Sequence, residues 1–542
     1  MEKRPMSLQA DWNPEIPPDT AQVGRTILAD DDPYRLVGDG VDAFLSLADF
    51  VGLYSELGRR AICPIILSLI TVFQFLENAP DRVAAQWAVT RIDWKYALHV
   101  PLTWLGFNFS DLSNFRRRLL EHGAERLVFD KVLGWVRSCG FLQKHGKQRS
   151  DSTHVLGCVE HLSRLELAWE TLRVALRAIQ AVASEWYEAI IPAAFHNAYV
   201  ERRSDWRLSK EEVKVEMQKA GRDGFWLLDH LDDSAPESVL VLSEVATLRT
   251  VWEQQFERRG DTKKVIVRQP PIKGKYIIVS PHDPEARWAE KRGREWIGYK
   301  LQATETAEDD VQVQFLTDVD AVAANDDDSE VVDEIQERLI TGDVKPGEHY
   351  VDRGYVSGPN LAHSAERGIE LVGPALADNS RKPEGYKQSD FQLNFEARQA
   401  TCPEGKTSVA WHECPQPDGH VGATVQFREQ CQDCPARAQC APGKSGRTLS
   451  ISPYHQELSQ RRAEQETEAF KERMRRRSAV EGTISELTRK HGARRARYRG
   501  KDKVRLQMLF TGAAANLKRL ARAQAARRQT QRQAQTGARA GC

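Results

Sequence analysis

The chain has 542 residues, of which 28% are charged and 41% are hydrophobic, a mixture typical of soluble globular proteins. This length is too great for one ordinary hydrophobic core and indicates two to four domains. The longest apolar run, Ala61 to Phe73, is shorter than the roughly 20 residues needed to span a bilayer, and no signal-peptide pattern opens the chain. A membrane protein or a secreted protein is therefore not expected.

The formal net charge is zero, because 77 Lys and Arg residues balance 77 Asp and Glu residues. The two signs are nevertheless separated along the chain. Residues 305–334 hold twelve acids and no Lys or Arg, whereas residues 487–542 hold sixteen Lys and Arg against the single acid Asp502. A segment this basic is expected to bind phosphate, so the zero net charge does not argue against a nucleic-acid partner.

The first 140 residues are expected to form a flexible arm over 1–30 and a helical domain over 31–140. Apolar spacing predicts helices over 61–76 and 81–98. A further short helix carries Arg116-Arg117-Arg118, and two short helices of which the second is basic are typical of a DNA-reading unit. The alternative is an all-α packing domain with a solvated basic face.

Residues 141–378 are expected to form an α/β unit interrupted by a helical insertion over about 160–290. Alternating polar and apolar residues predict five strands, over 148–157, 296–303, 311–319, 349–355 and 369–372. The second and third strands are expected to pair as a hairpin, and a helix is predicted over 331–339. Strands and helices that alternate in this way favour a sheet with at least one parallel pair.

Residues 379–450 are expected to form an insertion with a cysteine cluster, followed by long helices over 451–520 and a frayed basic tail over 521–542. Five of the nine cysteines lie between Cys402 and Cys440, which in a reduced cytosol indicates metal rather than disulfides. The Cys-x-x-Cys pair at residues 431 and 434 can bind one tetrahedral Zn²⁺. The other ligands are open at this point among Cys402, His412, Cys414 and Cys440, and free thiols are the alternative.

Three acids stand out by position. Asp151 lies within a predicted strand, where an acid is costly unless it is paired or binds metal. Asp352 ends a second strand, and Glu481 lies on a helix inside the basic region. Acids on two adjacent strands and a crossing helix would meet at one edge of a sheet and could hold two divalent ions about 3.5–4 Å apart. Alternatively, Asp352 only shapes a turn and Glu481 is a surface charge.

Several motifs together resemble the DDE transposases of bacterial insertion sequences, in the branch with an insertion between the second Asp and the Glu. The motifs of the core are Asp-Ser-Thr-His-Val-Leu at 151–156, Trp-Ile-Gly-Tyr-Lys at 296–300, Tyr-Val-Asp-Arg-Gly-Tyr-Val at 350–356 and Val-Glu-Gly-Thr-Ile-Ser at 480–485. The stretches at 91–98 and 112–116 are similar to the N-terminal domain of that branch, and those at 164–167 and 170–173 also match. The resemblance covers most of residues 30–520.

This resemblance implies a ribonuclease-H-like core that cleaves DNA and transfers the cut strand with two Mg²⁺ or Mn²⁺ ions. It assigns the catalytic triad to Asp151, Asp352 and Glu481. The family's insertion carries cysteines at similar places, which favours a structural zinc ion bound by Cys402, Cys431, Cys434 and Cys440. The implied partners are double-stranded DNA, as terminal inverted repeats and as target, and a second copy of the chain. The expected location is the cytoplasm, at the nucleoid.

Related transposases place a Tyr, an Arg and a further basic residue around the Glu. Here Arg477 and Arg489 flank Glu481, but Met474 stands where the Tyr is expected. DNA contacts are expected from the basic residues Arg477, Arg489, Arg494, Arg495, Arg497, Arg499, Lys503 and Lys300. Neighbouring acids such as Glu486 and Asp318 are expected to tolerate loss of charge. The alternatives are a catalytically inactive, domesticated DNA-binding derivative and a simple nuclease without strand transfer.

Overall fold

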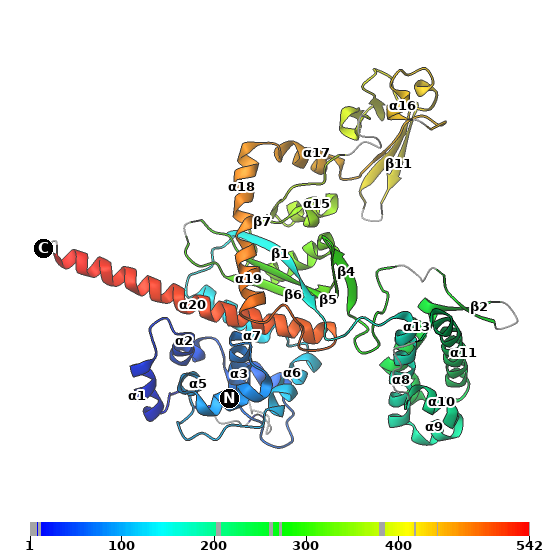
Figure 1. Ribbon diagram of the computed structural model, residues 1–542. Coiled ribbons are helices and arrows are strands. Elements are labelled where there is room, and N and C mark those ends of the chain that lie inside the picture. The colour runs from blue at the N-terminus through cyan, green and yellow to red at the C-terminus, as the bar shows by residue number, and fades with distance from the viewer. Residues whose placement is uncertain are drawn as a thin grey trace.

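The computed structural model describes residues 8, 12–201, 208–259, 264–269, 274–309, 311–378, 385–416, 419–441 and 443–540. Figure 1 shows a central sheet with helices on it, a helical lobe to one side and a small β-rich lobe at the top. The mixed α/β class expected from the sequence is confirmed. No helix in the described ranges has the length and apolar content needed to cross a membrane.

The central sheet has six strands, β1 (Lys147–Leu156), β4 (Arg287–Lys291), β5 (Arg294–Thr306), β6 (Leu316–Ala323), β7 (Glu348–Tyr350) and β8 (Glu370–Val372). Long β5 lies in the middle of the antiparallel half, with β1 along one edge and β4 and β6 in succession along the other. On its other edge, β1 pairs in parallel with β7, which pairs in parallel with β8. The expected β5–β6 hairpin and the expected parallel pair are both confirmed.

Short helices complete the α/β unit between the strands. They are η4 (Asp328–Val331), α14 (Val332–Thr341), η5 (Arg353–Tyr355) and α15 (Gly358–Glu366). In α14, Val332, Ile335 and Leu339 are buried at helical spacing, which explains why the pattern at 331–339 predicted this helix. The connections place β7 and β8 parallel to β1, so the carboxyl ends of β1 and β7 lie at the same edge.

The N-terminal helices share one hydrophobic core with the sheet. They are α1 (Pro18–Ile27), α2 (Pro33–Gly40), α3 (Pro64–Leu76), α4 (Asp81–Thr90), α5 (Ile92–Ala97), α6 (Ser110–Glu121) and α7 (Leu127–Ser138), with short 3₁₀ turns at Val41–Ala43 and Leu47–Leu53. Part of the expected arm is thus helical, since α1 begins at Pro18 and buries Thr20. Residues 1–7 and 9–11 of the expected arm lie outside the described residues.

The helix predicted over 81–98 is in fact two helices. Arg91 has extended backbone angles, φ −90° and ψ 130°, and ends α4 while it begins α5. Its guanidinium pairs with Asp93 at 2.5 Å and lies 5.4 Å from the centre of the Trp94 ring. Apolar periodicity alone does not reveal such a break, because the spacing continues across it.

The helical lobe has a hydrophobic core of its own. It comprises α8 (Arg164–Val182), α9 (Ser184–Ile190), α10 (Ala193–Tyr199), α11 (Lys210–Ser234), α12 (Glu237–Leu240), α13 (Ser243–Gln255) and the hairpin of β2 (Phe256–Arg259) and β3 (Lys264–Val267). Trp252 is fully buried and its indole N–H donates to the Gly221 carbonyl at 3.1 Å. The helical insertion expected over about 160–290 thus also contains a short β-hairpin.

The β-rich lobe contains the cysteine cluster. Its elements are η6 (Gln388–Asp390), β9 (Gln392–Asn394), β10 (Gln399–Thr401), β11 (Ala410–Pro415), β12 (Val421–Gln426), η7 (Arg428–Cys431), α16 (Arg437–Cys440) and β13 (Thr448–Ile451). Phe391, Val425 and Phe427 form its small core. The first residues of the expected insertion, 379–384, lie outside the described residues.

The chain returns to the sheet through α17 (His455–Glu464), α18 (Glu468–Ser478) and α19 (Val480–Arg489), and then enters the long helix α20 (Lys501–Ala540). Figure 1 shows α20 crossing beneath the sheet and projecting beyond the body at its C-terminal end. Leu517, Leu520 and Ala521 are buried against the core, so the helix continues past residue 521, where a frayed tail was expected.

Candidate active site

Asp151 lies in the middle of β1, just past the point where β1 stops pairing with β7, and Asp352 lies just past the end of β7. In the β1–β7 ladder, Arg149 is opposite Tyr350, and each aspartate lies two residues beyond this pair. Asp352 caps the short helix η5, because its Oδ1 accepts the Gly354 N–H at 2.7 Å. Asp352 therefore shapes the turn, which was the alternative that the sequence left open, and it also lies near Asp151.

One guanidinium joins the two carboxylates. Nη2 of Arg477, from α18, lies 3.1 Å from Asp151 Oδ2 and 3.8 Å from Asp352 Oδ2. The Arg477 side chain is only 19% exposed, and its Nε is a buried donor without a hydrogen-bond acceptor in the described structure. The sequence suggested that Arg477 would face DNA at the side of the helix. Instead it points into the sheet edge and neutralises both acids.

Burial and neighbouring charges oppose each other at Asp151. Burial is the largest effect and raises the pKa of the Asp151 carboxyl above its usual range. The Arg477 guanidinium and the N–H of Ser152 work in the opposite direction, whereas the nearby Asp352 carboxylate adds to the rise. This is the electrostatic pattern of two acids that share a site, which favours the binding of a cation between them.

Glu481 lies in the first turn of α19 and is exposed to solvent. Its carboxylate has no hydrogen bond or ion pair to any described residue. No three His, Cys, Asp or Glu side chains of the described ranges are grouped closely enough to hold a metal ion. The structure therefore brings together two of the three predicted acids, and it does not gather the third into a metal site with them.

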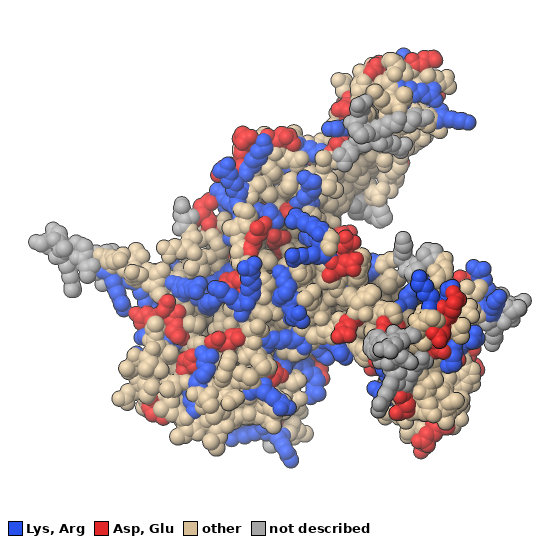
Figure 2. All heavy atoms as spheres, viewed as in Figure 1, with Lys and Arg blue, Asp and Glu red and all other residues tan. Residues whose placement is uncertain are grey.

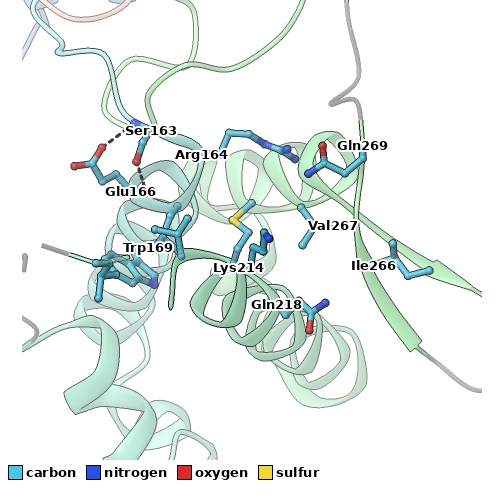
Figure 3. A pocket seen from close by; sticks show the side chains of 13 residues that line it. Ser163, Arg164, Glu166, Trp169, Lys214, Gln218, Ile266, Val267 and Gln269 are labelled. Atoms are coloured by element: carbon cyan, nitrogen blue, oxygen red, sulfur yellow. Dashed lines mark hydrogen bonds between the residues drawn. The ribbon is translucent and has the colours of Figure 1, made fainter. Parts of the chain in front are cut away.

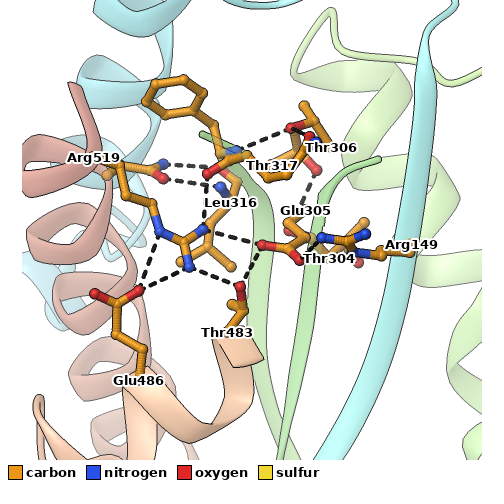
Figure 4. A network of polar contacts seen from close by, with 12 residues as sticks. Arg149, Thr304, Glu305, Thr306, Leu316, Thr317, Thr483, Glu486 and Arg519 are labelled. Carbon is orange, nitrogen blue, oxygen red and sulfur yellow. Dashed lines mark hydrogen bonds and ion pairs between the residues drawn. The ribbon is translucent and has the colours of Figure 1, made fainter. Parts of the chain in front are cut away.

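A buried ion-pair network holds α19 and α20 against the sheet, as Figure 4 shows. At its centre, Glu305 on β5 is 1% exposed and pairs with Arg149 on β1 at 2.6 Å. On the opposite side it accepts from Arg519 on α20 at 3.1 Å and from the Thr483 hydroxyl on α19 at 2.5 Å. Because Thr483 is two residues from Glu481, this network fixes the helix that carries the third predicted acid.

The same network corrects the expectation for two neighbouring acids. Glu486 on α19 pairs with Arg519 at 2.9 Å, and the nearby His491 ring, Arg519 and Lys518 together hold its pKa well below the usual range. Asp318 on β6 is 2% exposed and pairs with Arg338 at 2.9 Å. Neither is a surface acid, so neither is expected to tolerate loss of charge.

The predicted DNA contacts fall into two groups. Lys300 is 11% exposed and pairs with Asp328 at 3.0 Å. Arg494 donates to the His154 carbonyl at 2.7 Å, and Arg497 donates to the Ala79 carbonyl at 2.6 Å. These three cations bind the protein itself, which was not visible from their spacing.

The second group is exposed and shows no ion pair within the part of the chain that the structure describes. Its members are Arg489, Arg495, Arg499 and Lys503. Figure 2 shows basic side chains gathered on the face that α18, α19 and the start of α20 present. On α6, by contrast, Arg116 of the basic triplet is buried and pairs with Asp81 at 2.6 Å.

Met474, at the position where a Tyr was expected, packs against a buried cluster of Tyr350, Val372 and Phe470. This contact joins α18 to the sheet strands β7 and β8. An apolar side chain suits that position, so Met474 contributes to the packing that holds Arg477 over the carboxylates.

Four cysteines line one small cavity of about 20 Å³ in the β-rich lobe, and they are Cys402, Cys431, Cys434 and Cys440. Burial is the main cause that raises the pKa of the Cys440 thiol, and the other three cysteines are close enough to raise it further. His412 and Cys414 are exposed on β11 and do not line this cavity. The four thiols surround a common space, although they are not arranged as a metal-binding group.

A cavity of about 710 Å³ lies in the helical lobe, far from the acids (Figure 3). Leu165, Trp169, Met217 and Val267 make its lining mostly apolar. It contains no pair of acids, so it is not a candidate for the chemistry at the sheet edge.

Two family models match the chain. The model described as "Transposase DDE domain" matches residues 401–521, which include α18, α19 and Glu481. The model described as "Transposase domain (DUF772)" matches residues 23–118, most of the N-terminal helical region. No curated protein and no solved structure matches the chain.

Proposed function

The chain is a DDE transposase of the insertion-sequence type, and from this premise we propose that it cuts DNA at the ends of its element and joins them to a target. The observation that carries the proposal is the pair of aspartates, one in the middle of β1 and one just past the end of β7, both within reach of Arg477.

Asp151 and Asp352 are the residues that would hold divalent metal ions. Their carboxylate oxygens are the hard ligands that Mg²⁺ and Mn²⁺ prefer, and the parallel pairing of β1 with β7 brings both acids to one place. Two such ions bound there would activate a water or a 3′-hydroxyl for attack on a phosphodiester and stabilise the leaving oxygen. Arg477 lies against both acids and balances their charge.

Glu481 is proposed as the third ligand. It follows Arg477 by four residues, and its exposed carboxylate is not committed to any described residue. The Glu305 network holds α19 next to β1 and β5, which supports a role for this helix at the sheet edge. A ribonuclease-H-like core, with strand acids and a helix acid meeting at one edge, is the fold that we propose for this arrangement.

The partners are proposed from charge. The exposed cations of the α19–α20 region would bind the phosphates of double-stranded DNA, both the terminal inverted repeats and the target. A homodimer on DNA would hold the two ends of the element together. In the β-rich lobe, the four thiols that line one cavity would draw closer together to bind one Zn²⁺ ion, whose role would be structural, since four protein ligands leave no open position for chemistry.

The test is cleavage of end-labelled terminal-repeat DNA in Mg²⁺, run beside a gel-shift assay. Asp151→Asn and Asp352→Asn should abolish nicking and leave DNA binding nearly unchanged, because Asn keeps the size of the side chain but not its charge. Glu472→Gln is the matched control, since Glu472 is 66% exposed on α18. Normal cutting by Glu481→Gln would remove Glu481 from the triad. A wild type that binds but never cuts would establish the domesticated, non-catalytic alternative.

A further inference from the structure

The β4–β5 hairpin projects from the outer edge of the sheet (Figure 1). Arg292 and Gly293 alone connect the two strands. Both have positive φ angles, 54° and 74°, as a type I′ turn requires. This turn matches the natural twist of paired strands, so the tip is a defined structure and not a long loop.

Charges on this hairpin are sorted by sign onto its two faces. Lys291 lies directly opposite Arg294, and Glu290 lies directly opposite Glu295. Directly opposite residues share a face, and successive residues of a strand point to opposite faces. One face therefore carries two cations and the other carries two acids. Like charges directly opposite each other destabilise a hairpin, so the arrangement does not serve the stability of the free protein.

The cations of the tip are free to bind a partner. Lys291, Arg292 and Arg294 are exposed, and their side chains form no hydrogen bond or ion pair with the residues that the structure describes. By contrast, Lys300, Arg477 and Arg494, which also lie near the acids, are already bound to groups of the protein.

The base of the hairpin is anchored. Trp296 is 8% exposed and packs with Ala289 and Ala324. Its indole N–H donates to the Tyr299 carbonyl at 3.2 Å, and its ring centre lies 5.5 Å from that of His154. A rigid base holds the charged tip in a fixed position relative to β1.

That position is next to the candidate active site. Lys291 lies within electrostatic reach of Asp151, and Arg294 lies within electrostatic reach of His154 and Arg494. Arg494 in turn donates to the Thr153 hydroxyl, two residues from Asp151, at 3.0 Å. A DNA strand that reached the two aspartates would pass close to these cations.

We propose that the tip of the β4–β5 hairpin binds the phosphate backbone of DNA beside the cleavage site. This inference rests on the proposed function, because it names a contact for the same substrate. Closely spaced Lys and Arg side chains without a neutralising acid on their face suit a chain of phosphates, to which Arg can donate two parallel hydrogen bonds. Bound phosphates would also remove the repulsion between Lys291 and Arg294.

The experiment measures binding of the full chain to a short fluorescein-labelled duplex of mixed sequence by anisotropy, over a series of salt concentrations. The double variant Lys291→Ala/Arg294→Ala should bind more weakly, with the slope of log K against log salt reduced by about 1.8, since each phosphate contact contributes about 0.9. The matched control is Glu290→Gln/Glu295→Gln on the other face, which should keep the wild-type slope. An unchanged slope in the Ala variant overturns the inference.

A second variant separates binding from folding. Lys291→Glu places an acid opposite Arg294 and should raise the melting temperature, because opposite charges across a strand pair attract. The same variant should weaken DNA binding. Wild-type binding by Lys291→Glu contradicts the inference even if the melting temperature rises. The cleavage assay tests the proposed function separately, because the inference about the hairpin depends only on DNA binding.

Discussion

Neutralising Glu305 should loosen the contact between the sheet and α19. Glu305→Gln removes a charge that is 1% exposed, next to Arg149 and Arg519 side chains that are 9% and 10% exposed. Removing one partner of a buried ion pair costs about 3–5 kcal/mol, because the remaining charge is left buried. The amide oxygen of Gln still accepts one hydrogen bond, and Glu486 still pairs with Arg519. We therefore expect a loss near the lower limit, about 3 kcal/mol.

Hydrogen exchange of amides in β1, β5 and α19 is the suitable assay, because the lobes have separate cores and a global unfolding curve would mix them. Glu295→Gln is the control on the same strand. Glu295 is exposed, so its replacement should change the free energy of opening by less than about 0.5 kcal/mol. If Glu305→Gln costs under about 1 kcal/mol, or no more than the control, the network does not hold α19 in place.

Three further predictions follow from the described contacts. Replacing three exposed cations together by Ala should flatten the salt slope of DNA binding by two to three units, at about 0.9 per phosphate contact. These cations are Arg495, Arg499 and Lys503. Arg494→Ala should instead mainly lower the melting temperature, because Arg494 binds the protein itself. Elemental analysis should find about one Zn per chain, and zinc retained after Cys431→Ser/Cys434→Ser would contradict the assignment. Burial lowers the pKa of His349 to about 4. The unfolded chain therefore binds a proton first as the pH falls from about 6.5 to 4, and stability measured by denaturant titration should drop over that range by up to about 3 kcal/mol. His349→Gln should remove most of this dependence, and an unchanged pH profile would show that His349 does not cause it.

The sequence determined the features that depend on local pattern. Alternation predicted β1, β5 and β8 within a few residues, and the apolar spacing at 331–339 predicted α14. The sequence also suggested that Asp151 and Asp352 belong to adjacent strands, but only the structure shows that β1 and β7 pair in parallel. The spacing of the cysteines indicated a cluster before the fold showed which four line one cavity.

The charges of the site were decided by contacts between distant parts of the chain. Glu305 lies 156 residues from Arg149 and 214 from Arg519, and no local pattern relates them. In the sequence, Arg477 and Lys300 resemble the exposed Arg495, but only the fold turns the first two onto acids. The sequence Lys-Arg-Gly-Arg at 291–294 is typical of a turn. Only the register of β4 on β5 shows that the cations of the hairpin lie on one face and its acids on the other. Local propensity acts over a few residues, whereas burial and ion pairing depend on long-range packing, so the sequence located the acids and the tertiary structure selected the cations that are free to meet DNA.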